Sequence, residues 1–201
     1  MTQTDAKGDL QHYLQNAREA LVWKLDGLSE YSVRRPLTPT GTNLLGLVKH
    51  LSSVELLYFV FAFGRSIDDP PAWFRPDVAP NTDKWATSAE SRDLIVGTYK
   101  RAWQHSDATI LSVELEAKGF VPWLPNDQMS LHGVLVHVLA ETERHAGHAD
   151  IVRELIDGAV GRMPGNEQMA PGAEGELATR DTAWWETYRS GVELAAKQAD
   201  Q

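Results

Sequence analysis

Four of the seven histidines fall between His132 and His148, and the stretch from the second of them onward reads HVLAETERHAGH. Imidazole and carboxylate groups are common ligands of zinc and related ions. In a helix each residue turns by about 100°, so with Glu141 at zero His145 lies near about +40°, His148 near about −20° and His137 near about −40°. One face of a predicted helix is therefore dense in metal-ligating groups.

The pair Glu141 and His145 is separated by one helical turn, so both side chains can reach a single metal ion. A third ligand has to come from another element. His50 is the candidate, because it lies between the apolar positions Leu47 and Val54 and should face the interior of a bundle. Helical bundles build metal sites from facing helices in this way. The residues predict a metal site of His50, Glu141 and His145.

Plainer interpretations compete with this one. A lone histidine on an apolar face, such as His50, is commonly a core residue with a hydrogen-bond partner, and a histidine-rich helix face can be a solvated polar surface. The apolar neighbours Val134 and Val138 favour ligands over a solvated face. His12 and His105 stand among polar residues, and we interpret both as surface histidines.

The spacing also limits the metal chemistry. A di-iron carboxylate bundle uses Glu-x-x-His motifs, but the residue three positions after Glu141 is Arg144, and no such motif occurs. The HExxH motif of zinc proteases is absent as well. Two imidazoles and one carboxylate would hold one divalent ion, zinc in the first place and nickel or iron as alternatives, with positions open for water or substrate.

Helices are expected to position these residues. Apolar residues recur at helical spacing, with capping residues at the expected ends. The pattern predicts an all-α fold, an up-down four-helix bundle of antiparallel helices without strand pairing. The bundle is expected in residues 1–158, a Gly/Pro-rich linker in 159–180, and a C-terminal helix in 181–198 that packs on the bundle through its tryptophans. The bundle helices are expected at 9–28, from a Thr42 or Asn43 cap to Phe63, from a Thr87/Glu90 capping box past Ile110, and at 131–157, with a proline-rich loop at 68–83.

Composition restricts the partners. The formal net charge of −9 and the lack of a basic cluster argue against nucleic acid as a ligand. The richest apolar run, Leu44 to Phe63, is interrupted by Lys49, His50 and Glu55, and the first residues do not read as a secretory signal. We therefore expect a cytoplasmic protein without a membrane partner. The chain has no cysteine, so any thiol chemistry must use an external thiol.

Two segments resemble the DinB-like superfamily of metal-binding four-helix bundles: LLGLVKHLSSVE and SLHGVLVHVLAETERHAGHADIVREL. The resemblance covers about residues 8–158. It is nearest to the actinobacterial branch of mycothiol-dependent maleylpyruvate isomerase and mycothiol S-transferases. The resemblance implies metal binding by a histidine of the second helix and a Glu-x-x-x-His pair of the fourth, matching His50, Glu141 and His145. Many members of the superfamily carry His-x-x-x-His instead.

The resulting hypothesis is a divalent-metal-dependent S-transferase or isomerase that takes a small-molecule substrate and a mycothiol-type thiol, with the metal-activated thiolate as nucleophile. His148 or His137 would move the proton, and Arg144 would either hold an anionic substrate or form a surface ion pair. Two alternatives remain at this point, a non-catalytic metal-binding stress protein and a metal-assisted hydrolase. A homodimer is left open.

Overall fold

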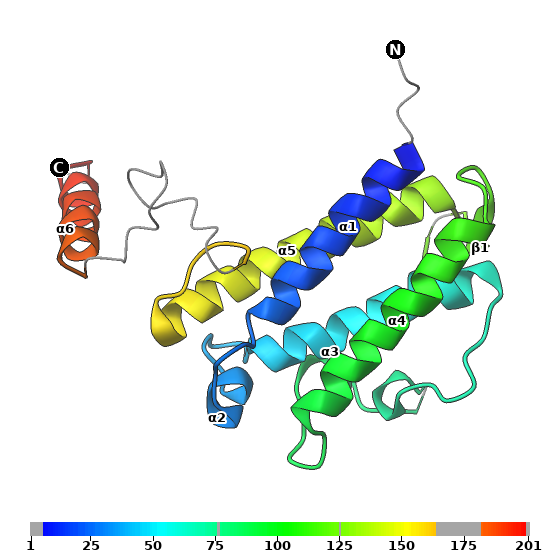
Figure 1. Ribbon diagram of the computed structural model, residues 1–201, viewed down its shortest axis with the longest axis horizontal. Helices are drawn as coiled ribbons and strands as arrows, with labels where there is room; N and C mark the ends of the chain where they lie inside the picture. The colour runs from blue at the N-terminus through cyan, green and yellow to red at the C-terminus, as the bar shows by residue number, and fades with distance from the viewer. Residues whose placement is uncertain (1–5, 76, 125, 164–181, 200–201) are drawn as a thin grey trace. The chain divides into compact units, whose positions relative to one another are not determined.

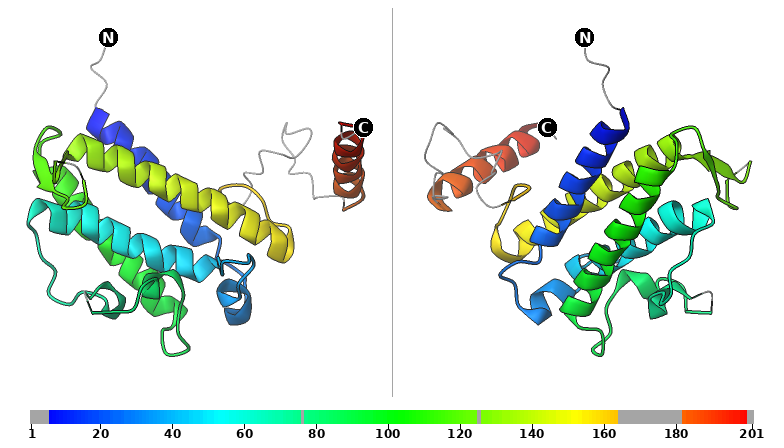
Figure 2. Two further views of the ribbon diagram at one scale, coloured as in Figure 1. Left: turned by 180° about the vertical axis from the view of Figure 1, so that it is seen from behind. Right: turned by 45° about the vertical axis from the view of Figure 1, so that its right-hand side comes forward.

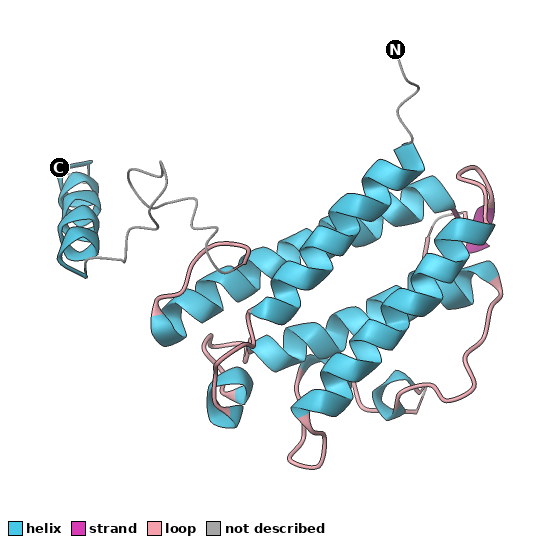
Figure 3. Ribbon diagram, in the orientation of Figure 1, coloured by secondary structure: helices cyan, strands magenta, loops and turns pink. Residues whose placement is uncertain are grey.

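The computed structural model describes residues 6–75, 77–124, 126–163 and 182–199 (Figure 1). The chain divides into two compact units, Met1–Arg162 and Met163–Gln201. Helices dominate the first unit, with one small hairpin beside them (Figure 3), and the predicted all-α class is confirmed. Its helices are α1 (Ala6–Trp23), α2 (Glu30–Arg34), α3 (Leu44–Glu55), α4 (Arg92–Ser112) and α5 (Leu131–Asp157); a π-helix (η1, Leu56–Val60) and a 3-10 turn (η2, Phe61–Phe63) continue α3.

The four long helices form a ring in which each packs against two others. α1 packs against α5 and α4, and α3 packs against the same two helices. The remaining views show α3 and α5 side by side (Figure 2). Residues of both helices line one pocket, so the groove between α3 and α5 joins distant parts of the sequence, the second and fourth predicted helices.

The helices do not simply alternate in direction. Lys49, midway along α3, pairs with Glu90 just before α4, whereas Arg65, just after η2, donates to Ser112 Oγ at the end of α4. α3 and α4 therefore run parallel, and antiparallel packing of all four helices is not what the structure shows. The connection of residues 64–91 is long enough to return the chain along the length of α3, which makes this topology accessible.

α5 and the continuous helical segment from α3 to η2 begin and end where their capping residues predict. The side chain of Asn43 accepts a hydrogen bond from Gly46 N, and that of Ser130 accepts one from Gly133 N. Gly64 after η2 and Gly158 after α5 both adopt left-handed backbone conformations that favour glycine. Both predicted helices are confirmed. The apolar sides of α3 and α5 contribute much of the core: Leu44, Leu45, Val48, Leu51, Leu131, Val134, Leu135 and Val138.

A buried ion pair lies among α1, α3 and α4. The Arg18 guanidinium donates two hydrogen bonds to the Glu55 carboxylate, at 2.6 and 2.7 Å, and a third to Asp107 at 3.0 Å. The side chains of Arg18 and Glu55 are both fully buried. Because a buried charge is costly without its partner, this pair restricts how the helices can slide past one another.

The start of α4 differs from the prediction. Thr87 and Glu90 were expected to open the helix, but α4 begins at Arg92, and the Ser91 hydroxyl caps it by accepting a hydrogen bond from Leu94 N. The Glu90 carboxylate accepts a hydrogen bond from Thr87 N and pairs with the buried Lys49. The capping-box spacing therefore forms an isolated turn, which the ion pair holds against α3.

Two short elements were not predicted. α2 occupies the connection before α3, capped by Ser29. β1 (Lys118–Phe120) pairs antiparallel with β2 (Gln128–Ser130), so the expectation of no strand pairing was wrong. The strands have three residues each, too few for an alternating apolar pattern to reveal them.

The segment Leu44–Phe63 is long and apolar enough to cross a membrane, with a mean hydropathy of 1.5, but 78% of the window is buried inside the fold. This burial is typical of the core helix of a bundle. The proline-rich connection contains two 3-10 turns, η3 (Ala72–Phe74) and η4 (Thr82–Lys84). Trp73 of η3 is buried, and its indole nitrogen donates to Ser52 Oγ.

The second unit contains α6 (Thr182–Ala199), close to the predicted range. On this helix the ring of Trp184 stacks on that of Tyr188, one turn away, at 5.3 Å. Asp181 and most of the predicted linker, residues 164–181, lie outside the described residues. The packing of this helix on the bundle stays a prediction.

Candidate metal centre

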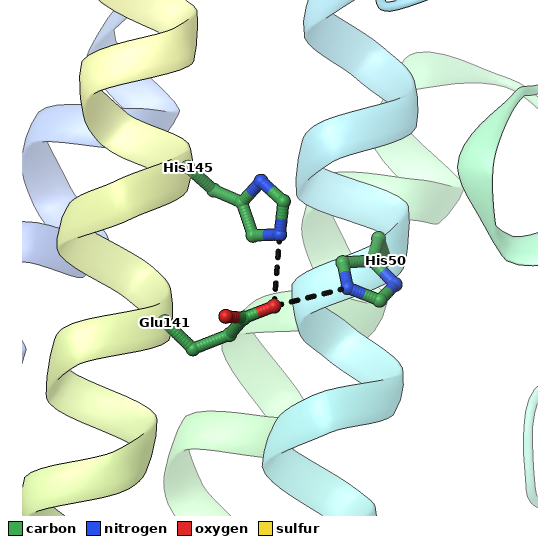
Figure 4. Close-up of side chains that lie close together, drawn as sticks. All are labelled: His50, Glu141 and His145. Carbon is green, nitrogen blue, oxygen red and sulfur yellow. Dashed lines mark hydrogen bonds and ion pairs between the residues drawn. The ribbon is translucent and has the colours of Figure 1, made fainter.

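The three predicted ligands converge at the groove between α3 and α5. Nε2 of His145 lies 3.0 Å from Oε1 of Glu141, and Nε2 of His50 lies 3.7 Å from the same oxygen (Figure 4). One ligand atom from each residue lies within 4.8 Å of the other two. Glu141 and His145 come from successive turns of α5, and His50 comes from α3 across the groove. The structure therefore brings these side chains together as the helical spacing predicts.

Partial exposure distinguishes this cluster from core polar groups. The side chains of His145, His50 and Glu141 are 16%, 19% and 28% exposed. Their neighbours on the helices, Leu51 and Thr142, are fully buried. The cluster therefore lies at the edge of the core, where a small molecule can approach it. His50 faces the groove and not the centre of the bundle.

Asp83 of η4 orients His50, and the sequence analysis missed this residue. Oδ2 of Asp83 lies 2.6 Å from Nδ1 of His50. Burial alone would raise the pKa of Asp83, but the hydrogen bond from His50 and the positive charge this histidine can carry oppose burial, and the pKa is lowered. Because the carboxylate is ionised, Nδ1 of His50 carries the hydrogen and donates it. Nε2 then presents its lone pair to the groove, as in many histidine metal ligands.

The protonation states also suit metal ligands. Burial lowers the pKa of His145, and the nearby His50 lowers it further against the opposing effect of Glu141. The pKa of Glu141 is lowered too, because its interactions with His145 and His50 outweigh the effect of burial. Near neutral pH the cluster therefore combines a neutral imidazole with an ionised carboxylate, the states in which both groups bind metals.

The donor set fits one divalent ion. Two imidazole nitrogens and one carboxylate oxygen are one of the ligand sets of catalytic zinc sites, which keep a further position for water or substrate. The Asp83–His50 hydrogen bond supplies the outer support that such sites use. We therefore retain His50, Glu141 and His145 as the predicted metal ligands.

A pocket of about 740 Å³ adjoins the cluster, within the range of small-molecule sites. Two of the other predicted site residues, Arg144 and His148, line it, and Nδ1 of His148 lies 3.2 Å from Nδ1 of His145. His137 does not line it; its ring packs against Tyr58, with 4.5 Å between ring centroids. Residues of two loops form another wall, which we call the loop wall: Thr40, Gly41, Thr42, Asn43, Asn81, Lys84 and Trp85.

The loop wall is held close to α3 by backbone contacts. Asn43 donates to the carbonyl oxygen of Lys84 at 3.3 Å, and the Lys49 ammonium donates to that of Trp85 at 2.9 Å. A Cβ atom on Gly46 would overlap the carbonyl oxygen of Lys84. No sequence motif predicts that Asp83, Lys84 and Trp85 lie at the site. Their position beside α3 depends on the close approach of the Lys84 carbonyl oxygen to the helix, which needs a glycine at position 46.

The first unit is a four-helix bundle with a cluster of two histidines and a glutamate that could hold a metal ion. Comparison with protein families matches the Mycothiol-S-transferase family over residues 9–158. The chain belongs to this family, which is part of the DinB-like superfamily, so the resemblance found in the sequence is confirmed. No individual curated protein matches the chain. The family name suggests a transferase with mycothiol as thiol and a small-molecule substrate.

Proposed function

We propose that the chain is a divalent-metal-dependent mycothiol S-transferase that joins the thiol to a small electrophile in the pocket beside His50, Glu141 and His145. Membership of the Mycothiol-S-transferase family over residues 9–158 supports the transferase activity. A pocket of about 740 Å³ beside a metal-type donor set supports the location of the site, and it is the observation on which the proposal rests. This volume suits a thiol and a second substrate together. We propose zinc as the ion and the cytoplasm as the location.

A divalent ion held by the three residues would supply positive charge that lowers the pKa of a bound thiol near neutral pH. The chain's own residues do the remaining work. Asp83 keeps the Nδ1 hydrogen of His50 in place, so Nε2 stays directed at the groove. Ionised Glu141 adds a negative charge from α5, and His145 stays neutral.

In the proposed reaction the thiol sulfur forms a bond to an electrophilic carbon. The bond between that carbon and its leaving group breaks, and the leaving group departs with the electron pair. His148 accepts the thiol proton at Nδ1 as its exposed ring turns from His145 toward the pocket, and then releases the proton to water. We assign no proton transfer to His137, because it does not line the pocket.

The test is thioether formation. Protein purified without a metal-affinity tag is incubated with mycothiol and 1-chloro-2,4-dinitrobenzene, and the product is followed by absorbance and mass spectrometry. We expect metal-dependent turnover that Glu141→Ala abolishes, whereas Glu154→Ala, an exposed glutamate on the same helix, leaves it unchanged. Substrate loss without thiol would favour the hydrolase alternative. Bound metal without turnover for any thiol would favour the non-catalytic alternative, and either outcome overturns the proposal.

A further inference from the structure

The pocket beside the metal-type cluster is less negative than the chain as a whole. Three of its lining residues carry formal charges near neutral pH: Lys84 and Arg144 are positive, and Glu141 is negative. The lining thus has a formal charge of +1, and the ionised Asp83 behind His50 brings the site to zero, on a chain of −9. Because a concave pocket concentrates the field of its lining, this difference favours anionic ligands.

Unlike most basic residues of the described bundle, the two cations make no close ion pair, although Lys84 interacts electrostatically with the neighbouring Asp83. Arg18, Arg153 and Lys49 each bind a carboxylate of the fold. Within residues 6–163, as far as the structure describes them, neither Lys84 nor Arg144 has a hydrogen-bond or ion-pair partner for its side chain. Each is solvent-exposed and lines the pocket, so an incoming ligand would not have to displace an internal partner.

The two residues come from different walls. Arg144 lies on α5 between the predicted ligands Glu141 and His145 in sequence, and Lys84 lies on the loop wall next to Asp83. Lys84 has little backbone freedom, because its carbonyl oxygen accepts from Asn43. Cations from two different walls are the arrangement expected for a group bound between them. A guanidinium suits a carboxylate especially well, since it can donate two parallel hydrogen bonds.

We infer that the electrophilic substrate carries a carboxylate-type anionic group, and that Arg144 and Lys84 select it. This inference rests on the proposed function. A low-molecular-weight thiol would present its thiolate at the histidine and glutamate cluster, so two additional cations in the pocket fit an anion on the other substrate. The same residues would discriminate against neutral electrophiles of equal size.

The kinetic test compares 4-chloro-3-nitrobenzoate with its methyl ester as electrophiles for mycothiol. The quantity measured is the ratio of kcat/KM for the acid to that for the ester. Each of Arg144→Gln and Lys84→Gln should lower the ratio roughly tenfold, which corresponds to about 1.4 kcal/mol. Lys100→Gln, an exposed lysine on α4 outside the pocket, should leave the ratio unchanged. An unchanged ratio in both pocket variants would overturn the inference.

Equilibrium binding gives a readout independent of turnover. The unreactive pair 3-nitrobenzoate and 3-nitrobenzamide is titrated calorimetrically into protein with and without added zinc. We expect benzoate to bind more tightly in both states, with the preference lost in Arg144→Gln and weakened by salt. A preference that survives in the double variant, or exists only with zinc, would mean that the ion and not these residues binds the anion, and would overturn the inference.

The two tests separate the claims. If wild-type protein conjugates the ester as efficiently as the acid and binds both probes equally, the proposed transfer stands and the anion selection falls. If neither electrophile reacts but the benzoate preference disappears in Arg144→Gln, the anion site is supported and the proposed transfer falls.

Discussion

The imidazole of His50 donates its Nδ1 hydrogen to Asp83 across 2.6 Å, so a residue of the proline-rich connection determines which nitrogen of a core-helix histidine faces the groove. Removing such an outer partner typically weakens metal binding by about 10- to 100-fold. We expect this loss for Asp83→Ala, measured by competition with a chromophoric zinc chelator. Asp77→Ala, an exposed aspartate of the same connection, is the matched control. Equal affinities for the two variants would show that Asp83 does not support the site.

Gly46 has no ligand role, yet the site should depend on it. A Cβ atom there would overlap the carbonyl oxygen of Lys84, so Gly46→Ala must push the loop wall and Asp83 away from α3. We expect metal affinity to fall at least about tenfold and the free energy of unfolding to fall by about 1–3 kcal/mol.

The control for this variant is Gly147→Ala. A Cβ atom on Gly147, within α5, meets nothing within 4 Å, so this change should stabilise the protein by up to about 1 kcal/mol through helix propensity. Chemical denaturation and chelator competition measure both quantities. If the alanine at 46 is tolerated as well as the one at 147, the close approach does not hold the loop wall in place.

The sequence predicts the helical frame well because its signals are local. Asn43, Ser130 and Gly158 cap or end their helices as their residue types predict, and the spacing of Glu141 and His145 places them on one face of α5. Convergence with His50 follows once α3 and α5 are neighbours. Metal binding by these three residues stays a prediction that spacing and geometry both support.

Features that depend on contacts between distant segments could not be predicted. Asp83 reaches His50 only because η4 lies against α3, and no local pattern encodes that approach. Glu90 belongs to a capping-box pattern, but it forms an ion pair with Lys49, and α4 begins two residues later, at Arg92. The parallel course of α3 and α4 likewise depends on where a long connection returns the chain.

The buried pair of Arg18 and Glu55 should dominate stability among the polar contacts. Glu55→Gln removes the buried charge partner of Arg18 and leaves only the partly exposed Asp107, so it should lower the free energy of unfolding by about 3 kcal/mol. Replacing both residues, with Arg18→Met and Glu55→Leu together, should cost less than the single change, because no unpaired charge remains. Urea denaturation at neutral pH checks both. A double variant at least as unstable as Glu55→Gln would contradict this account.

Acid should weaken the turn that precedes α4. Burial would raise the pKa of Glu90, but hydrogen bonds from Lys49 and from Thr87 N outweigh it, and the pKa is lowered. A carboxyl with a lowered folded-state pKa stabilises the fold above its unfolded pKa, about 4.3, and loses that contribution as the pH falls through the folded-state value.

We therefore expect Glu90→Gln to have a free energy of unfolding about 1.5–3 kcal/mol lower than wild type at pH 7. On acidification below about pH 4.3 the free energy of unfolding of the variant should fall by less than that of wild type. Urea denaturation of both proteins between pH 3 and 7 measures the difference. The exposed Glu154→Gln serves as the control, since its unfolding curve should follow wild type at every pH. Parallel pH profiles for wild type and Glu90→Gln would rule out this linkage.

The central claim is that Glu141 holds a divalent ion together with His50 and His145. The most direct test is the metal content of protein purified without a metal-affinity tag, determined by elemental mass spectrometry for wild type, Glu141→Ala and the control Glu154→Ala. We expect about one equivalent of metal ion per chain in wild type and in Glu154→Ala, and almost none in Glu141→Ala. Equal metal content in all three proteins, or none in wild type after growth with added zinc, would contradict the central claim.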